Sequence, residues 1–414
     1  MNPPSGKTVA LFNSLWMGHH PMYFTQFTAS FLRGGASVIG FCPEPEAALR
    51  DLLRSIDPDT AKDVANRVHF FRLPTGKRSF FNGRFEGDPV RTFSRWRAAA
   101  ESLAAAESET GLHADLVYFP YLDSYLRFLP FPAVPGILLN RPWSGLYLRN
   151  HHHGEPPSVK KFIRMLAKGD AIFRSDLCRG IGVLDERFIP AMQVSSTIRI
   201  TPYPDVTQAN LPAEPYALAL EIQSKAAGRI IIGMIGIERR KGFLTILRTA
   251  KLARELRRPY YFVCAGTVCL TEFTPEEQAE IRLLSDGVDN VYFDPHAGRI
   301  PSEADYNWLF RTFHIAWAAY EGFEGSSGTL GKAAAFEIPC IATVGECVGD
   351  RVESYRLGLT IPEGNPEQAL AVIPYLVAGT DPKGDPLLAR FKEYRDHHSI
   401  ERLDRILREL LETI

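Results

Sequence analysis

Residues 229–256 read RIIIGMIGIERRKGFLTILRTAKLAREL, and this stretch decides the fold of the second half of the chain. Its first seven residues are almost continuously apolar, which is typical of a strand buried on both faces. Gly236 is followed by a short polar loop, and after Gly242 the apolar residues recur at the spacing that predicts a helix over 243–256. A buried strand joined to a helix by a short loop is half of a βαβ unit.

Apolar runs of this kind alternate with helical patterns along the whole chain. In the first half, strands are predicted at residues 8–13, 37–42, 67–72, 116–119, 136–140, 171–173 and 182–184. In the second half, they are predicted at residues 229–235, 260–265, 290–293, 315–318, 340–343 and 359–361. Continuous apolar strands with helices between them indicate parallel sheets covered on both faces. The sequence therefore predicts an α/β protein with two tandem doubly wound, Rossmann-like domains.

A proline-rich stretch separates the two series of strands. The chain has 414 residues, which exceeds one ordinary domain and fits two. Four prolines lie between residues 202 and 215, and such a cluster is typical of a linker. We therefore place an N-terminal domain at residues 1–205 and a C-terminal domain at 206–384. A ligand is expected in the cleft between them, at the carboxyl ends of the strands.

The charge of the chain is balanced in total but not in distribution. The 47 Lys and Arg against 48 Asp and Glu give a net charge of −1, which argues against a nucleic-acid-binding protein. Residues 1–205 nevertheless carry +5 and residues 206–414 carry −6. Much of the positive charge lies in residues 67–97, where eight Lys and Arg are interleaved with seven Phe and Trp. That segment is either a solvated loop and helix or a surface for an anionic acceptor or membrane.

The sequence shows no export signal. The first residues, Met-Asn-Pro-Pro-Ser-Gly-Lys, lead into a strand without the apolar segment of a signal peptide. No apolar run is long enough to span a bilayer. The six cysteines form no C-x-x-C pair and mostly stand in apolar runs, so we expect buried, reduced thiols. These features predict a cytoplasmic protein that touches a membrane, if at all, from its surface.

The glycine-rich segment GSSGTLGK at residues 325–332 follows a predicted strand and opens a helix. It differs from a P-loop, because its glycines are spaced one residue too far apart and alanine follows the lysine. With Ser326 or Ser327 as N-cap, the helix would direct backbone N–H groups and its positive end toward an anion such as a diphosphate. The plain alternative is a capped helix without a ligand.

Three consecutive cations, Arg239, Arg240 and Lys241, stand in the loop after the strand at residues 229–235. Adjacent cations at the end of a strand are favourable when they share an anion. Lysine binds phosphate as a point charge and arginine as a forked donor, so together they would neutralise a diphosphate. The alternative is a solvated turn.

Together, the two segments resemble the nucleotide-sugar domain of family-4 glycosyltransferases of the GT-B fold, over residues 230–362. That family has a strand, a glycine, a short Arg-containing loop and then Lys-Gly at the start of a helix, which match Gly236 and Lys241-Gly242 here. It also has two Glu eight residues apart, followed by Pro-Val-Ile-Ala, which matches Pro339-Cys-Ile-Ala. Further matches are Gly345, Gly349-Asp350 and Leu357-Gly-Leu-Thr-Ile-Pro.

The two glutamates of the family are the point at which this chain departs from it. Counted back from Pro339, the first falls on Glu324 and the second on Lys332. Glu321-Gly-Phe also reads like the motif, but its spacing to Pro339 is three residues too long, so Glu324 is preferred. The second Glu usually holds the ribose hydroxyls of the donor, and a lysine cannot accept those hydrogen bonds. Lys332 is expected to reach a phosphate instead.

A second departure is Ile237, which stands where many relatives have an arginine, so Arg239 or Arg240 must take that role. The resemblance implies a retaining transferase that requires no metal and uses a nucleotide-diphosphate sugar, such as a UDP- or GDP-sugar. The catalytic residues that it implies are Lys241, Glu324 and Arg240. The donor-binding residues are Gly18, Gly236, Arg239, Ser326, Ser327, Gly328, Thr329 and Lys332. It also implies that helices in residues 385–414 pack back on the N-terminal domain.

The N-terminal half supplies candidates for the acceptor. In this fold the loop after the first strand, here Trp16-Met-Gly18-His19-His20, lies beneath the sugar and diphosphate. The acceptor-binding residues expected there and at the ends of two later strands are His19, His20, Asp123, Trp143 and Ser144. Relatives often carry a histidine near the reacting carbon at the position of Asn140–Gly145, and because this chain lacks it, no general base is assigned.

Two further signals are weaker. Residues 151–153 are three adjacent histidines, which cannot all converge on one ion, and no carboxylate or Cys pair is near them in sequence, so no metal site is predicted. No G-x-G-x-x-G follows a strand, which argues against a nicotinamide-dependent dehydrogenase.

The expected function is transfer of a sugar from a nucleotide donor to a sugar, a lipid-linked or another small-molecule acceptor. The basic N-terminal half favours an anionic or lipid-linked acceptor. The alternatives are other GT-B chemistry, such as an epimerase or phosphorylase, and a catalytically silent scaffold that binds a nucleotide or a partner protein. Only Lys332 in place of the second Glu supports the scaffold.

Overall fold

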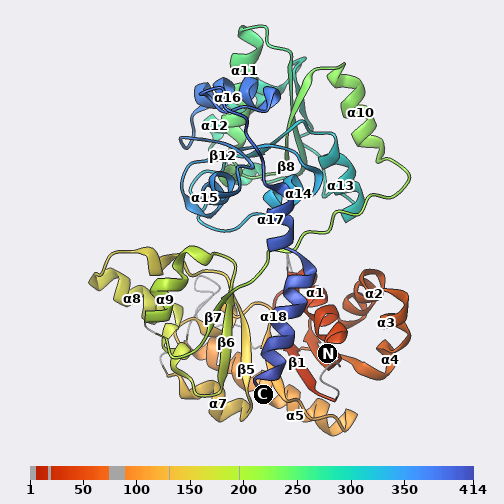
Figure 1. Cartoon of the computed structure of the whole chain (residues 1–414), viewed down its shortest axis with the longest axis vertical. Coiled ribbons are helices and arrows are strands. Elements are labelled where there is room, and N and C mark those ends of the chain that lie inside the picture. Colours follow the sequence, from red (N-terminus) through yellow and green to blue (C-terminus); the bar gives the residue numbers. More distant parts are fainter. Residues whose placement is uncertain (1–5, 17–19, 74–88, 130, 195) are drawn as a thin grey trace. The chain divides into compact units, whose positions relative to one another are not determined.

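The computed structural model describes residues 6–16, 20–73, 89–129, 131–194 and 196–414, and the chain divides into two compact units (Figure 1). Unit 1 comprises Met1–Pro204 and Ile400–Ile414, and unit 2 comprises Asp205–Ser399. The last helix therefore belongs to the unit that contains the N-terminus.

Unit 1 is built on a parallel sheet, whose strands in the described residues follow the order β3-β2-β1-β4-β5-β6-β7. The strands are β1 Thr8–Phe12, β2 Ser37–Cys42, β3 Val68–Arg72, β4 Leu116–Phe119, β5 Trp143–Tyr147, β6 Cys178–Val183 and β7 Ile200–Pro202. Strands β1 and β4 are buried throughout, because helices cover both faces of the sheet. The strand order reverses between β1 and β4, which makes the carboxyl ends of these two strands the expected ligand position in unit 1.

The helices of unit 1 cover this sheet and its edges. They are α1 His20–Arg33, α2 Pro45–Ser55, α3 Pro58–Lys62, α4 Val64–Arg67, α5 Pro89–Thr110, α6 Asp123–Leu126, α7 Ala133–Leu139, α8 Val159–Lys168, α9 Ile189–Val194 and α18 Ile400–Glu412, with short 3-10 turns η1 His151–Gly154, η2 Asp170–Arg174 and η3 Glu186–Phe188. Helix α18 is held to α1 by an ion pair of 2.7 Å between Arg33 and Asp404. Lys7 Nζ also donates to the carbonyl of Leu411 at 2.6 Å, so the chain end is tied to the first strand.

Unit 2 repeats the architecture with the order β10-β9-β8-β11-β12-β13 in its sheet, as far as the chain is described. The strands are β8 Ile230–Ile237, β9 Tyr260–Val268, β10 Val291–Phe293, β11 Ile315–Ala318, β12 Cys340–Thr343 and β13 Gly358–Ile361. The helices are α10 Ala217–Ala226, α11 Phe243–Glu255, α12 Pro275–Ser285, α13 Glu303–Arg311, α14 Gly328–Phe336, α15 Glu346–Tyr355, α16 Pro366–Ala378 and α17 Phe391–His397, with turns η4 Arg239–Lys241 and η5 Leu270–Glu272. Alternate residues of β8 enter the cores on its two faces, Ile232 on one and Ile231 on the other. The predicted α/β class with two parallel sheets is confirmed.

Several predicted elements differ from the observed ones in unit 1. Residues 136–140 were expected to form a strand but lie in α7, and the strand follows at Trp143–Tyr147. Asn140 ends α7 in the left-handed conformation, with φ of 49°, and this is a common helix terminator. Residues 171–173 form the turn η2 instead of a strand, and β7 was not predicted.

The predicted C-terminal segment 385–414 is divided between the units. Its first helix, α17, contacts α14 and α15 and belongs to unit 2, whereas α18 belongs to unit 1. None of the described helices combines the length and the apolar composition needed to cross a bilayer. All six cysteines are free thiols, and burial raises the pKa of Cys42 to about 12.

Candidate functional site

The candidate site of unit 2 lies where its strand order reverses, at the carboxyl ends of β8 and β11. Strand β8 continues into turn η4 and helix α11, and β11 continues into the loop that precedes α14. The two loops are joined directly, because the backbone N–H of Glu321 donates to the carbonyl of Arg240 at 2.8 Å. Gly242 makes this approach possible: it has φ of 72°, and a Cβ there would come within 2.2 Å of the Ala319 carbonyl oxygen. The two segments that carried the sequence resemblance therefore meet.

Lys241 places a half-buried ammonium group at this edge. Its Nζ donates to the carbonyl of Ile235 at 2.9 Å and lies 3.7 Å from a carboxylate oxygen of Glu238. Gly236 has φ of 79°, and a Cβ on it would come within 2.5 Å of that ammonium. Burial lowers the pKa of Lys241, and the nearby carboxylate of Glu238 opposes this shift. An anion above Gly236 would meet a preplaced, partly desolvated cation.

The two arginines of η4 point to different partners. Arg239 forms an ion pair of 2.7 Å with Glu277 on α12, and its backbone N–H donates to Glu272 at 3.0 Å. Arg240 donates to Glu238 at 2.6 Å, and its guanidinium lies 5.6 Å from the centre of the Phe323 ring. Of the two, Arg240 therefore stays beside Lys241.

Glu238 is a member of this site that the sequence analysis did not single out. Burial by itself would raise the pKa of Glu238, but the charge of Lys241 and the hydrogen bond from Arg240 hold it below its usual value. Its carboxylate is thus ionised and balances the two cations. The sequence signal that could have identified Glu238 is its position directly before the three cations at residues 239–241.

Two glutamates compete for the role that the resemblance gave to Glu324. Glu321 accepts a hydrogen bond of 2.5 Å from Thr245 near the start of α11, and its backbone contacts Arg240. Glu324 is exposed and stands three residues further along the loop. The contacts place Glu321 beside the cations, although the spacing to Pro339 favoured Glu324.

Residues 326–329 form the amino end of α14, as predicted, with Ser327 as N-cap. The Ser327 hydroxyl accepts from the backbone N–H of Thr329 at 3.2 Å. The Tyr320 hydroxyl is hydrogen-bonded to the side-chain hydroxyls of Ser327 and Thr329, each at 2.8 Å. Ser326 donates to Asp205 at 2.6 Å and accepts from Arg351 at 2.7 Å. These serine and threonine side chains hold the loop in place, and Gly328 is exposed at the helix end.

The side chain of Lys332, which was expected to reach a phosphate, is engaged inside unit 2. Its side chain is buried, and its ammonium donates to Glu303, Asn307 and the carbonyl of Gln208. These oxygens lie on α13 and on the segment that enters unit 2, so the lysine ties α14 to both. Burial lowers the pKa of Lys332, and Glu303 counteracts this. Lys332 thus has partners inside unit 2.

In unit 1, the expected acceptor residues have different positions. Gly18 and His19 lie outside the described residues. His20 begins α1, and its ring packs edge-on against Tyr121 with the ring centres 4.3 Å apart, next to the carboxyl end of β4. Asp123 is buried, and its two carboxylate oxygens accept from the backbone N–H groups of Leu148 and Arg149, each at 2.9 Å. Asp123 thus fixes the backbone that carries Arg149, a residue that the sequence analysis missed.

Trp143 and Ser144 do not have the positions expected of acceptor contacts. Both lie inside β5 and are 0% and 1% exposed. Trp143 packs against Trp96, and the Ser144 hydroxyl donates to the carbonyl of Gly180 at 2.8 Å. The expectation failed because the strand begins at residue 143, after α7, so these side chains serve the core.

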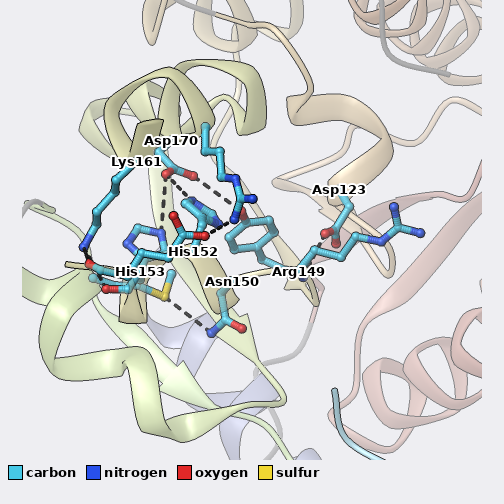
Figure 2. Close-up of polar contacts among 11 residues, drawn as sticks. Asp123, Arg149, Asn150, His152, His153, Lys161 and Asp170 are labelled. Atoms are coloured by element: carbon cyan, nitrogen blue, oxygen red, sulfur yellow. Dashed lines mark hydrogen bonds and ion pairs between the residues drawn. The ribbon is translucent and has the colours of Figure 1, made fainter. Parts of the chain in front are cut away.

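A buried cluster follows β5 and contains the histidines at residues 151–153. Figure 2 shows His152 and His153 of η1 facing Asp170, the first residue of η2, which follows helix α8. The Asp170 carboxylate lies 2.6 Å from Nε2 of His152 and 3.4 Å from Nε2 of His153. Burial would raise the pKa of Asp170, but these two histidines hold it below its usual value.

The same three residues could hold a metal ion, since their ligand atoms lie within 4.8 Å of one another. The sequence argument looked for a carboxylate close by and missed Asp170, which folding brings in from 18 positions further along. As the side chains stand, Asp170 contacts both histidines directly, in a buried polar cluster.

Comparisons with known proteins define the fold. No protein-family model matches the sequence, and no curated protein matches it. Solved structures do match: HepE from Anabaena, in complex with UDP and glucose, has a TM-score of 0.63 at 12% identity, covering 99% of this chain and 100% of that one. Sucrose-phosphate synthase from Thermosynechococcus elongatus has a TM-score of 0.64 at 15% identity, with 99% of both chains covered. The UDP-forming α,α-trehalose-phosphate synthase from Burkholderia vietnamiensis has a TM-score of 0.63 at 12% identity, covering 99% and 98%. The chain shares with these proteins the two-domain α/β fold known as GT-B.

Proposed function

We propose that the chain is a glycosyltransferase that moves a sugar from a nucleotide-diphosphate sugar to an acceptor. The observation that carries the proposal is the joined pair of loops at the switch point of unit 2, where Gly236, Arg240, Lys241 and Glu321 come together. The fold adds support, because similar structures include one solved with UDP and glucose and one described as UDP-forming. A UDP-sugar is accordingly the first donor to test, and a GDP-sugar the second.

In this proposal, the donor diphosphate lies above Gly236 and the amino end of α14. Lys241 and Arg240 would exchange their contacts with Glu238 for phosphate oxygens, since a diphosphate carries more charge than one carboxylate. Fixed cations at this position stabilise the negative charge that develops on the leaving nucleotide. These cations would neutralise the charge of the diphosphate, a task that a metal ion performs in other enzymes. We therefore propose transfer without a required metal.

The sugar would contact Glu321, or Glu324 as the family spacing suggests, through its hydroxyls or its positively charged reacting centre. Retention of anomeric configuration is part of the proposal and rests on the resemblance to family 4. Acceptor binding is assigned to unit 1, near His20 and Arg149, at the carboxyl ends of β4 and β5. A cytoplasmic location is also proposed, supported by six free cysteines. The silent scaffold that binds a nucleotide or a partner protein stays the alternative, since Lys332 stands where the resemblance implies a second Glu.

The test is turnover. The full chain is incubated with UDP-, GDP- and ADP-sugars, with and without a panel of sugar and lipid-linked acceptors, and release of the nucleoside diphosphate is measured. Transfer is supported by a glycosylated product, and NMR of its anomeric proton tests retention. A chelator added to the same reaction tests the metal requirement. An isomerised donor without transfer would indicate an epimerase, and no nucleotide release with any donor would contradict the proposal.

A further inference from the structure

Helix α8 presents its apolar side chains outward. Val159, Phe162, Ile163 and Leu166 are 77%, 61%, 58% and 46% exposed. Their spacing of three, four and seven residues places all four on one face of the helix. No residue of α8 is buried. In an ordinary surface helix the apolar stripe faces the core, so the orientation of α8 is reversed.

The polar face of α8 attaches the helix to unit 1. Lys161 reaches back from the helix, and its ammonium donates to the carbonyls of His153 and Glu155 at 2.9 and 2.6 Å, as Figure 2 shows for Lys161 and His153. Arg164 forms an ion pair with Glu155. Ser158 caps the amino end by accepting from the backbone N–H of Lys161 at 3.0 Å. The reversed orientation is therefore held by specific contacts.

The charges of α8 all have one sign. Its four charged residues are Lys160, Lys161, Arg164 and Lys168, and Lys160 is exposed. Burial lowers the pKa of Lys168, and the neighbouring charges of Arg149 and Arg127 contribute to this shift while Asp123 opposes it. A group of cations thus lies at the carboxyl end of the helix.

The apolar surface continues past α8 into the loop before α7. The backbone N–H of Phe128 donates to the carbonyl of Ala167 at 2.9 Å, and the Phe128 side chain is 39% exposed. An exposed aromatic residue therefore stands next to the last turn of α8.

We propose that α8 is an interfacial helix that docks unit 1 on an anionic lipid bilayer. Its apolar face would enter the boundary between headgroups and acyl chains, and the exposed Lys160 together with the cations near Lys168 would contact lipid phosphates. A ten-residue helix is about 15 Å long, so it lies in the plane of the membrane rather than across it. Charge complementarity favours this occupant, because the four charged residues of α8 itself are all cationic, and an apolar helix face carried with such cations fits an anionic bilayer.

This assignment is independent of the proposed function, since vesicle binding requires no turnover. It also moves the expected membrane contact away from residues 67–97, of which 74–88 lie outside the described residues. If both proposals hold, α8 would bring the cations near Lys168 and Arg149 close to the headgroups of lipid-linked acceptors.

The experiment is co-sedimentation of the full chain with vesicles of phosphatidylcholine alone and of phosphatidylcholine mixed equally with phosphatidylglycerol. We expect binding to the anionic vesicles that weakens at high salt. The double variant F162D/I163D should lower the bound fraction at least about tenfold, because two inserted apolar side chains are replaced by anions. The matched control is L283D, which changes a leucine that is 78% exposed on α12 in unit 2, and it should bind like the parent chain.

A labelled variant keeps the test decisive if F162D/I163D is unstable. Ile163→Cys carries an environment-sensitive fluorophore, in a Cys269→Ser background because the other five cysteines are buried. Its emission should shift to the blue with anionic vesicles, whereas a label on Leu283→Cys should not respond. Equal vesicle binding by the parent and F162D/I163D, or no binding by the parent, would overturn the proposal. A parent dimer that F162D/I163D converts to a monomer, without vesicle binding, would identify the face as a contact between two copies.

Discussion

The ammonium of Lys241 donates to the carbonyl oxygen of Ile235 at 2.9 Å, and this contact sets the cation over Gly236 at the end of β8. The backbone of one strand thus fixes the position of the charge that the proposed donor would meet. Because both partners come from the βα unit of residues 229–256, the site depends on the same stretch that decides the fold.

Gly236→Ala should damage this arrangement in two ways. A side chain at φ of 79° is strained by about 1–2 kcal/mol, and its Cβ would displace the ammonium of Lys241. We expect reduced thermal stability and weaker nucleotide binding. Gly228→Ala is the matched control, since Gly228 has φ of 81° and nothing within 4 Å of the added Cβ. It should cost similar stability and leave nucleotide binding unchanged; an equal loss of binding in both variants would refute the role of Gly236.

Glu321→Gln should lower kcat for sugar transfer more than Glu324→Gln does. Glu321 is held by Thr245 and lies beside Arg240, whereas Glu324 is exposed. Loss of a charge that contacts the reacting centre is expected to cost about 10²-fold in kcat or more. Steady-state kinetics on the two isosteric variants distinguish them, with folding checked by circular dichroism. The reverse order would restore the assignment that motif spacing favours.

Lys332→Met should destabilise unit 2 without changing the affinity of the chain for the nucleotide. Without the ammonium, the buried Asn307 side chain and the Gln208 carbonyl lose a donor, which costs about 1–3 kcal/mol. Urea unfolding measures this loss, and calorimetry measures the affinity for UDP. Lys251→Met, at an exposed position on α11, serves as the control. Normal stability together with lost UDP affinity would show that Lys332 binds phosphate after all.

Asp170 should make unit 1 sensitive to acid. Its pKa is lowered in the folded state because the hydrogen bonds from His152 and His153 outweigh the effect of burial. A depressed pKa means that the carboxylate stabilises the fold above its unfolded pKa of 3.8, and that this stabilisation is lost as pH falls through the folded value. We expect the free energy of unfolding to fall more steeply below pH 3.8 in the parent than in Asp170→Asn. Asp176→Asn, at an exposed position, should behave like the parent. Identical pH profiles for the parent and Asp170→Asn would contradict the assignment.

The sequence predicted those features that depend on local pattern. Continuous apolar runs such as residues 8–13 and 229–235 form strands, as expected of a parallel sheet covered on both faces. Residues 136–139 are also apolar, yet they form the last turn of α7, which Asn140 ends in the left-handed conformation. Composition alone does not separate these outcomes.

Contacts between residues far apart in the sequence could not be predicted from the local sequence pattern. The partners of Lys332 come from α13 and the linker, and Asp170 reaches the histidines only once η1 and η2 are folded. Likewise, Glu321 reaches the cation loop through a backbone hydrogen bond to Arg240, whereas counting from Pro339 pointed to Glu324. Spacing along the chain identified the loops of the site, and folding decided which side chains face each other.

The most direct test of the central claim is calorimetric titration of UDP, GDP and ADP, and of their sugars, into the parent chain, Lys241→Ala and Lys251→Ala. Lys251 is half exposed on α11 and serves as the charge-matched control. We predict that one nucleotide series binds the parent and Lys251→Ala equally. Lys241→Ala should bind it at least about tenfold more weakly, because a charge-assisted contact to phosphate is lost. Absence of binding by the parent, or equal binding by Lys241→Ala, would contradict the account.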